Sequence, residues 1–285
     1  MVPVTVAKRR RNMKSVCCCK SLLIACFVLL GAWLLGACSQ SPENDPSFVN
    51  IGEFSIKKLP ENCTEIRDGA GRILVLVPRG QKPPKGYGKN RIIETPVRRV
   101  VAYSGFNIGI LKVLGAIDTL VGVTHKRDYW TIDEVVKGMD SGKIACIGET
   151  NAIDFEKLKS IEPDLVLTWD ACAISMINEL GIPGVITTTG EAMDLNTRMR
   201  FARFLALFFN REREADEYVA KVQNAIKSVK DSFLNSDFDK GPRPKVIWGD
   251  IYEKRVMVEP GNSWAAEMIE LAGGDYLFDD ISGAS

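Results

Sequence analysis

After Pro96 the chain alternates between short apolar segments and helical segments, and this alternation restricts the possible folds more than any other feature. The apolar segments predict strands at 97–103, 120–124, 164–169 and 184–188. The segments between them predict helices at 106–114, 154–161 and 172–180. Such spacing is typical of a parallel sheet with right-handed crossovers. The strand at 164–169 is almost entirely apolar, as expected when both sheet faces are covered. We therefore predict an α/β fold.

Two further helices follow. The first is predicted at 196–209, with Asn210 as a left-handed stop. The second, at 212–233, carries one apolar stripe: Ala215, Tyr218, Val219, Val222, Ile226, Val229 and Phe233. At about 1.5 Å per residue it is roughly 30 Å long, enough to cross one domain and lead to another. Residues 239–244 form a boundary, after which strands at 245–248 and 256–258 and a helix at 263–272 begin a second α/β unit.

The N-terminus indicates export. Basic residues precede an apolar run at 21–37, which ends in Leu35-Gly36-Ala37-Cys38. A basic region, an apolar region and small residues before the cut are typical of a secretory signal. The end of the run resembles the lipobox of bacterial lipoproteins, which predicts a signal peptide at 1–37, lipidation of the Cys38 thiol and a linker at 38–47. The alternative is a transmembrane helix, for which 17 residues is at the short end.

Composition excludes several classes of function. The six basic residues before Cys38, subtracted from 37 in the whole chain, leave 31 against 36 acidic residues, a net charge of −5. Such a protein is poorly suited to nucleic acid. His125 is the only histidine, which argues against a multi-histidine metal site and against most Ser-His-Asp hydrolases. The nucleotide-binding glycine motifs and the Gly-x-Ser-x-Gly elbow are absent from the sequence. Cys63, Cys146 and Cys172 are expected to be small buried residues.

The order of the parts resembles the substrate-binding lipoproteins of ABC importers for iron complexes and cobalamin, over about 65–285. The matching segments are Asp68-Gly69-Ala70-Gly71-Arg72, Arg98-Arg99-Val100-Val101-Ala102, Leu114-Gly115-Ala116, Leu120-Val121-Gly122-Val123, Ile147-Gly148, Asp154-Phe155-Glu156-Lys157-Leu158, Ile161-Glu162-Pro163-Asp164-Leu165-Val166, Pro260-Gly261-Asn262-Ser263 and Leu271-Ala272-Gly273-Gly274-Asp275. The resemblance implies two Rossmann-like lobes with parallel sheets joined by one long helix. The residues at 48–96 themselves predict short strands and turns, with an apolar strand at 73–77. We therefore place the first lobe, with a leading β-hairpin segment, at 48–210, the bridging helix at 211–240 and the second lobe at 241–285. Family members continue beyond the position of Asp279-Asp280, so the second lobe is expected to be incomplete here.

In parallel sheets ligands bind outside the carboxyl ends of the strands. Applied to the predicted strands, this rule selects a set of ligand-binding candidates: Ser104, Gly105, His125, Lys126, Arg127, Tyr129, Trp130, Glu149, Thr150, Trp169, Asp170, Thr189, Gly190, 250–252 with Tyr252, and Trp264. Aromatic rings there suit a macrocycle or an aromatic chelator, and Lys126 and Arg127 suit an anionic one. The alternatives are that the tryptophans are core or rim residues, that Lys126 and Arg127 are a solvated pair, and that His125 contacts no ligand. Trp248, inside an apolar segment, is expected in the core.

The resemblance implies a role for Glu156 as well. It occupies the position of a family glutamate that docks into a basic pocket of the permease, although an ordinary surface glutamate is the alternative. The resulting hypothesis is a non-catalytic lipoprotein without cofactor or bound metal of its own. It captures a ferric siderophore outside the cytoplasm and delivers it to an ABC permease dimer. The alternatives are cobalamin or haem as the ligand, an extracytoplasmic α/β enzyme, and a surface scaffold that binds a protein.

Overall fold

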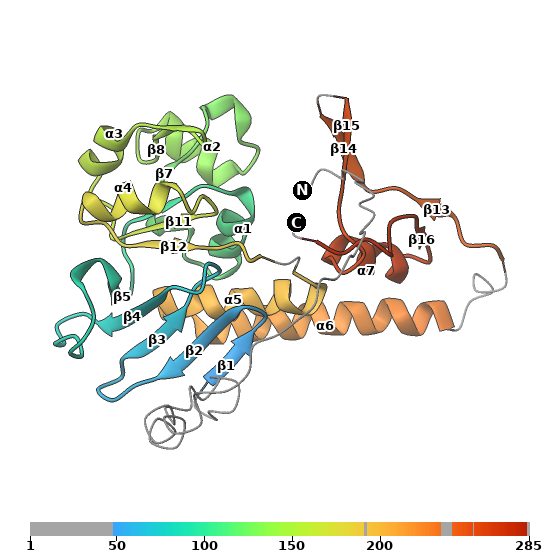
Figure 1. The fold of residues 1–285 in the computed structure, drawn as a ribbon, viewed down its shortest axis with the longest axis horizontal. Coiled ribbons are helices and arrows are strands. Elements are labelled where there is room, and N and C mark those ends of the chain that lie inside the picture. The colour runs from blue at the N-terminus through green and yellow to red at the C-terminus, as the bar shows by residue number, and fades with distance from the viewer. Residues whose placement is uncertain (1–47, 191–192, 235–240, 253, 284–285) are drawn as a thin grey trace, which may run out of the picture.

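The computed structural model describes residues 48–190, 193–234, 241–252 and 254–283 (Figure 1). The predicted signal peptide at 1–37, Cys38 and the linker to residue 47 lie outside these ranges. Two α/β units are present, and a pair of helices connects them (Figure 1). Among the described helices, none combines the length and the apolar character that a membrane crossing requires.

The first unit contains the predicted parallel sheet. Its order is β12-β11-β6-β7-β8, and every neighbouring pair runs parallel. The strands are Val100–Ala102 (β6), Leu120–Val123 (β7), Ala145–Cys146 (β8), Leu165–Thr168 (β11) and Gly184–Ile186 (β12). The helices around them are Gly105–Val113 (α1), Asp133–Asp140 (α2), Phe155–Ser160 (α3) and Ala173–Glu179 (α4). A short hairpin, Gly148–Glu149 (β9) with Ala152–Ile153 (β10), precedes α3. The predicted α/β class is confirmed.

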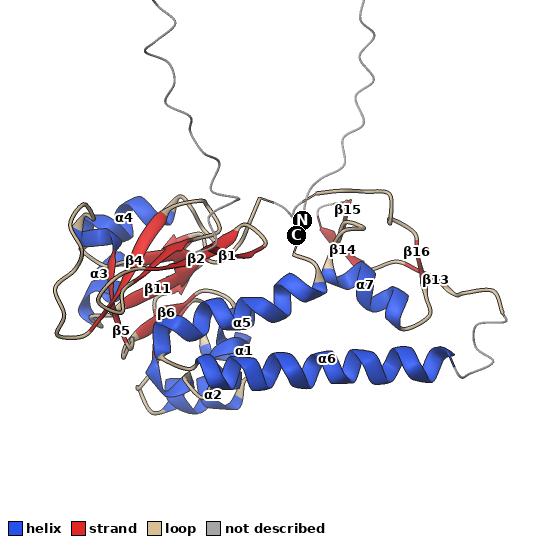
Figure 2. Ribbon diagram, turned by 90° about the horizontal axis from the view of Figure 1, so that it is seen from below, coloured by secondary structure: helices blue, strands red, loops and turns tan. Residues whose placement is uncertain are grey.

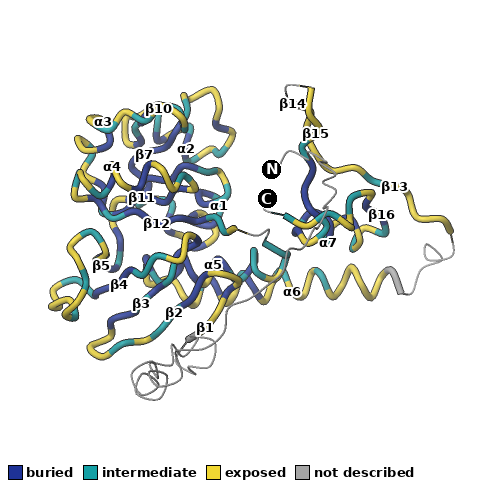
Figure 3. Tube along the Cα trace, in the orientation of Figure 1, coloured by how far each residue is buried: buried dark blue, intermediate teal, exposed yellow. Residues whose placement is uncertain are grey.

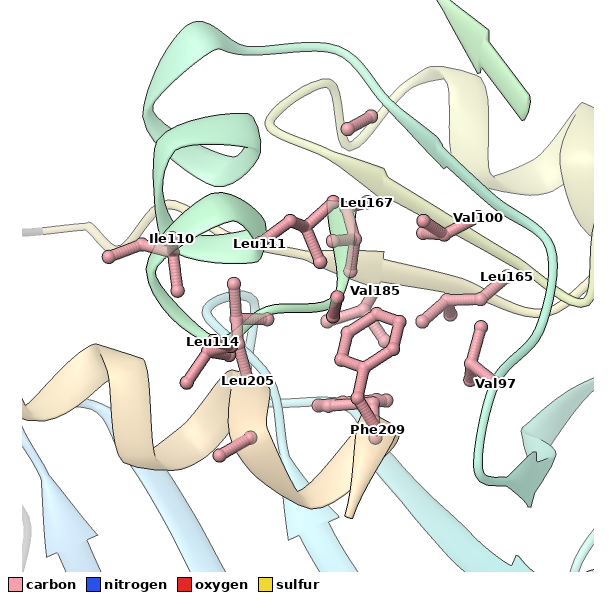
Figure 4. Close-up of a cluster of buried hydrophobic side chains, with 14 of the residues drawn as sticks. Val97, Val100, Ile110, Leu111, Leu114, Leu165, Leu167, Val185, Leu205 and Phe209 are labelled. Atoms are coloured by element: carbon pink, nitrogen blue, oxygen red, sulfur yellow. The ribbon is translucent and has the colours of Figure 1, made fainter. Parts of the chain in front are cut away.

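Helices cover both faces of this sheet, as the alternation of side chains along β6 shows. Val100 and Ala102 belong to a buried cluster with α1, α2 and α5 (Figure 4). Val101 and the following Tyr103 belong to a second cluster, with α3 and α4. Successive side chains of a strand point to opposite faces, so this arrangement makes the sheet doubly wound.

A second sheet, β1-β2-β3-β4-β5, precedes the parallel one, where the sequence indicated a leading hairpin segment. Its strands are Phe48–Ile51 (β1), Phe54–Lys58 (β2), Thr64–Arg67 (β3), Ile73–Pro78 (β4) and Ile92–Thr95 (β5). The first four are antiparallel neighbours, and β5 runs parallel to β4. Ile51, Phe54, Ile66, Leu74 and Ile93 pack into the same core as the parallel sheet. Strands such as Thr64–Arg67 carry too few apolar residues to be recognised before this packing is known.

Two antiparallel helices complete the first unit and lead to the second. α5 spans Leu195–Phe209 and ends at Asn210, whose φ of 54° and ψ of 50° confirm the predicted left-handed stop. α6 spans Glu212–Leu234 and runs from the first unit to beneath the second (Figure 2). Ala215 and Val219 are fully buried, whereas Val229 is exposed. Along α6 the buried stretches lie near the first unit, and the later turns are mostly exposed (Figure 3). The first half of the apolar stripe is therefore the half that packs against the first unit.

The second unit is small. It contains Lys245–Val246 (β13), Gly249–Tyr252 (β14), Arg255–Val258 (β15), Trp264–Leu271 (α7) and Asp275–Tyr276 (β16). β13 pairs parallel with β16, and β14 and β15 form a hairpin. Ala266, Ile269 and Tyr276 form its core.

Two expectations about burial were wrong. Trp248 was expected in the core, but it is 51% exposed, because β13 ends at Val246 and Trp248 lies between the strands. The three cysteines were expected to be buried, but this holds only for Cys63. Cys146 is half-buried and Cys172 is exposed, and all three are free thiols. Cys172 lies in the turn before α4, where nothing covers it in the described part of the chain.

Candidate functional site

The parallel sheet changes winding direction between β6 and β11. From β6 the chain passes through α1 to β7 and then to β8, on one side of β6. β11 and β12 lie on the other side, and β11 pairs directly with β6. The carboxyl ends of β6 and β11 are therefore neighbours whose connections diverge. Ligands of open α/β sheets bind at such a switch point. It is bordered here by Ser104 and Gly105 after β6 and by Trp169 and Asp170 after β11.

Hydrogen bonds fix the first turn of α1 at this point. Ser104 is the N-cap of α1, and its hydroxyl accepts a bond from the Asn107 amide at 3.3 Å. The Asn107 side chain is fully buried and donates through Nδ2 to Thr187 Oγ1 at 2.9 Å. The Thr187 hydroxyl in turn donates to the Thr168 carbonyl at 3.2 Å. The ends of β11 and β12 and the start of α1 are thus joined. Asn107 was missed by the sequence reasoning, although a polar residue among the apolar positions of α1 was a visible sign.

Trp169 and Asp170, the two predicted residues at the end of β11, have different surroundings. The Trp169 side chain is 45% exposed. Asp170 Oδ1 accepts a bond from the Cys172 amide at 2.8 Å, which makes Asp170 a turn residue before α4. Close by, the Tyr103 hydroxyl is buried and has no hydrogen-bond partner among the described residues. Burial, and secondarily the charge of Asp170, raise the pKa of Tyr103, so its phenol is neutral at physiological pH.

The loop after β7 carries five of the predicted residues: His125, Lys126, Arg127, Tyr129 and Trp130. His125 has a φ of 66°, a left-handed backbone that is uncommon outside glycine, and its amide donates to the Gly148 carbonyl at 2.8 Å. Its Nδ1 hydrogen-bonds to the Glu149 carboxylate. Its ring stacks on Tyr129, with centroids 4.1 Å apart. Tyr129 is 63% exposed, so one face of this stack is open to solvent.

The remaining residues of this loop support the stack or point elsewhere. Trp130 is only 6% exposed, and its Nε1 donates to the Thr124 carbonyl at 3.0 Å. It meets Tyr129 edge-on, at 5.3 Å between centroids. Lys126 is exposed, and Arg127 forms an ion pair with Asp140 at 3.0 Å. The structure therefore holds Arg127 toward α2 rather than leaving it without a partner.

The other candidates lie around this edge or in the second unit. Thr150 follows β9 and Thr189 follows β12, and both are half-buried. The Gly190 amide donates to Glu53 Oε2 at 2.8 Å. Tyr252 is the last residue of β14. Trp264 is the first residue of α7, and its ring faces Arg198. Glu156 is exposed in the first turn of α3.

This arrangement is suited to binding. Tyr129 lies in the loop after β7 and Trp169 directly after β11, and both side chains are exposed. β7 and β11 lie on either side of β6, so at a strand spacing of about 4.8 Å these two strands are about 10 Å apart. No group of three or more His, Cys, Asp or Glu side chains in the described ranges is arranged to hold a metal ion. The chemistry present is aromatic stacking and hydrogen bonding by side chains held at one edge of the sheet.

Comparison with known sequences agrees with this geometry. The family described as Periplasmic binding protein matches residues 100–284. An uncharacterized lipoprotein of Methanocaldococcus jannaschii is 26% identical over 203 residues, which are 68% of this chain and 48% of that protein. The vitamin B12-binding protein of Vibrio campbellii is 21% identical over 188 residues, 64% of this chain and 62% of that protein. The chain thus spans about half the length of the first relative and less than two thirds of the second.

Solved structures show the same fold. A possible iron-binding (periplasmic solute-binding) protein of Staphylococcus epidermidis has a TM-score of 0.51 at 18% identity, covering 67% of this chain and 71% of its own. A periplasmic solute binding protein of Veillonella parvula also has a TM-score of 0.51 at 18% identity, covering 79% and 63%. At this identity the likeness concerns the fold alone.

Proposed function

Since this chain belongs to the periplasmic binding protein family, a family of binding proteins and not of enzymes, we propose that it is the solute-binding component of an ABC importer. Its proposed ligand is an iron complex, a ferric siderophore, captured outside the cytoplasm. The observation that carries the proposal is a pair of exposed aromatic side chains at one edge of the parallel sheet: Trp169 at the switch point and Tyr129 in the loop after β7. Such rings suit a flat chelator. Cobalamin and haem are the alternative ligands within the same function.

The proposed contacts are the residues gathered at this edge. Ser104, Thr150, Asp170 and Thr189 supply polar groups, His125 and Lys126 supply nitrogen donors, and Trp264 contributes from the second unit. Arg127 and Trp130 are proposed to support the site indirectly. Arg127 holds the loop through its ion pair with Asp140, and Trp130 supports the Tyr129 ring through their edge-on contact. Tyr252 is retained as a proposed contact from β14.

Delivery requires a membrane location and a partner. We propose that Cys38 carries the lipid anchor and that an ABC permease dimer receives the ligand. A relative named as a lipoprotein supports the anchor. The exposed position of Glu156 on α3 supports its role in docking, because one accessible carboxylate can pair with an arginine cluster on the permease.

Replacing Trp169 with alanine is expected to weaken binding of the cognate ligand about tenfold or more, because a stacking face is lost. Trp248→Ala is the matched control, since both side chains are about half exposed, 45% and 51%, but only Trp169 lies at the switch point. The measurement is tryptophan fluorescence of each variant during ligand titration. Equal losses of affinity in the two variants would remove Trp169 from the site.

The ligand itself is identified by titrating the full chain in detergent with ferric hydroxamate and ferric catecholate siderophores, cobalamin and haem. Saturable quenching by one class supports the proposed function and names the ligand. A folded chain, verified by circular dichroism, that responds to none of these ligands contradicts the proposal.

A further inference from the structure

One cation lies between aromatic rings from the two units. Arg198 is in the first turn of α5, and its guanidinium carbon is 4.2 Å from the centre of the Phe106 ring. On the other side the same carbon is 4.4 Å from the centre of the Trp264 ring. Phe106 is the second residue of α1, directly after the switch point, and Trp264 is the first residue of α7. Arg198 therefore joins the start of one helix in each unit.

Each ring is fixed on its own side. Phe106 stacks on Phe201 at 5.7 Å between centroids, and Phe201 is fully buried in the core of the first unit. The Trp264 amide donates to the Met193 carbonyl at 3.0 Å. Three residues further on, Glu267 Oε2 accepts a bond from the Leu195 amide at 2.9 Å. The start of α7 is thus held against the start of α5, with Arg198 in the middle of the contact.

The charge of Arg198 has few other partners. Within the described residues its guanidinium forms no hydrogen bond or ion pair, and its contacts are the Phe106 and Trp264 rings. Burial lowers the pKa of Arg198, while the nearby charge of Glu259 raises it. Glu259 is 8% exposed, and its Oε2 has no hydrogen-bond partner in the described part of the chain. The contacts that hold this cation are therefore the two ring faces, and a cation between rings is attracted more strongly when it is removed from water.

We propose that Arg198 is a positioning residue that sets α7 and the second unit relative to the switch point of the first. A guanidinium is planar and can stack on a ring with each face, whereas an uncharged chain of similar length cannot bind both rings in this way. Any displacement of Phe106 beside Ser104 and Gly105 is passed to Trp264 through this stack. The relation to ligand binding rests on the proposed function, but the positioning of α7 does not.

The positioning is tested without ligand by hydrogen exchange and by fluorine NMR of the full chain labelled with 5-fluorotryptophan. Trp264→Phe identifies the Trp264 resonance. Arg198→Met is expected to move that resonance and to speed exchange of the α7 amides about tenfold or more, because the junction opens locally. Arg200→Met is the matched control on the same helix, since Arg200 makes a surface hydrogen bond to the Asn50 carbonyl at 2.9 Å. An Arg198→Met protein that behaves like Arg200→Met overturns the proposal.

A second variant covers the case in which Arg198→Met does not fold. Trp264→Leu removes the stack from the side of the second unit and leaves the first-unit core intact. It is expected to speed exchange of the α7 amides while the amides of α1 beyond its first turn stay protected. Unchanged exchange in α7 counts against the proposal.

Measurements of ligand affinity test separately whether the positioning of α7 by Arg198 affects the binding site. For a ligand that binds the wild-type chain, Arg198→Met is expected to weaken binding about tenfold, while Arg200→Met leaves it within about twofold. Unchanged affinity in Arg198→Met, with a loosened junction, overturns the link to the site. Should the wild-type chain bind no ligand, the proposed function fails, and the exchange and NMR results still decide whether Arg198 positions α7.

Discussion

Replacing Asp68 with alanine is expected to lower the free energy of unfolding by about 3 kcal/mol or more, the usual cost of removing one partner of a buried ion pair. The Asp68 side chain is completely buried and pairs with Arg72 at 2.6 Å. Its carboxylate also accepts bonds from the backbone amides of Ala70, Arg72 and Ile186. Alanine would leave these three donors without their acceptor, and a buried donor left unpaired is costly.

The turn at Asp68–Arg72 covers the edge strand of the parallel sheet. β12 is the edge strand of the parallel sheet, and the Asp68–Arg72 turn binds along its outer side. The Gly69 amide donates to the Ile186 carbonyl at 3.0 Å, and Arg72 Nη2 donates to the Gly184 carbonyl at 2.6 Å. A Cβ on Gly69 would lie 1.8 Å from the Thr188 carbonyl oxygen, so only glycine permits this approach. The turn thus satisfies an edge that would otherwise be open to pairing with another chain.

Urea unfolding followed by circular dichroism measures the effect. Asp118→Ala is the control, because Asp118 pairs with Lys143 at the surface and its side chain is 92% exposed. Surface ion pairs of this kind contribute about 0–1 kcal/mol. If Asp68→Ala is no more destabilising than Asp118→Ala, the turn does not hold β12 in solution.

Replacing Phe204 with alanine is expected to cost about 3–5 kcal/mol of stability, as large-to-small changes in a core do. Phe204 is fully buried on α5. Its ring lies 4.9 Å from that of Phe54 and 5.6 Å from that of Phe201, measured between centroids. Because α5 packs against both sheets, the cavity would open in the centre of the first unit. Phe204→Leu, measured by the same urea unfolding, keeps most of the volume and is expected to cost less than about 1.5 kcal/mol.

The same residue tests whether the leading sheet belongs to this core. Phe54 comes from β2 and Phe204 from α5. A double-mutant cycle with Phe54→Ala and Phe204→Ala is expected to give a coupling energy of about 0.5–1.5 kcal/mol, typical of an aromatic pair in contact. Strictly additive losses would mean that the leading sheet is energetically independent of α5.

The sequence predicted well the helices whose ends carry local signals. The start of α3 is an example: the helix was predicted to begin at residue 154, and the Asp154 side chain caps it by accepting a bond from the Lys157 amide. The stop at Asn210 is another. Other elements were missed. β8 has only two residues, too few for a periodic pattern. α2 does carry the spacing of one helix face, at Ile132, Val135, Val136 and Met139, and this signal was overlooked.

The sequence predicted which residues lie at the strand ends that form the candidate site, but it did not predict the contacts between their side chains. The rule that ligands bind at carboxyl ends of strands selected His125, Tyr129 and Trp169 from the order of strands alone. It could not predict that Trp130 is buried under Tyr129, because burial depends on what the folded loop covers. Nor could it find Asn107 or Arg198, whose partners come from distant parts of the chain.

The sequence by itself determined the α/β class, the order of the strands and helices that carry clear local signals, and the approximate ends of those helices. These properties depend on residues within a few positions of one another, so periodicity, caps and turns record them. Only the tertiary structure decided how Asn107 meets Thr187, 80 residues away, and how Asp68 meets Ile186, 118 residues away. Such pairs depend on the order of strands in the sheet and on the packing of both faces, which no local pattern of residues encodes.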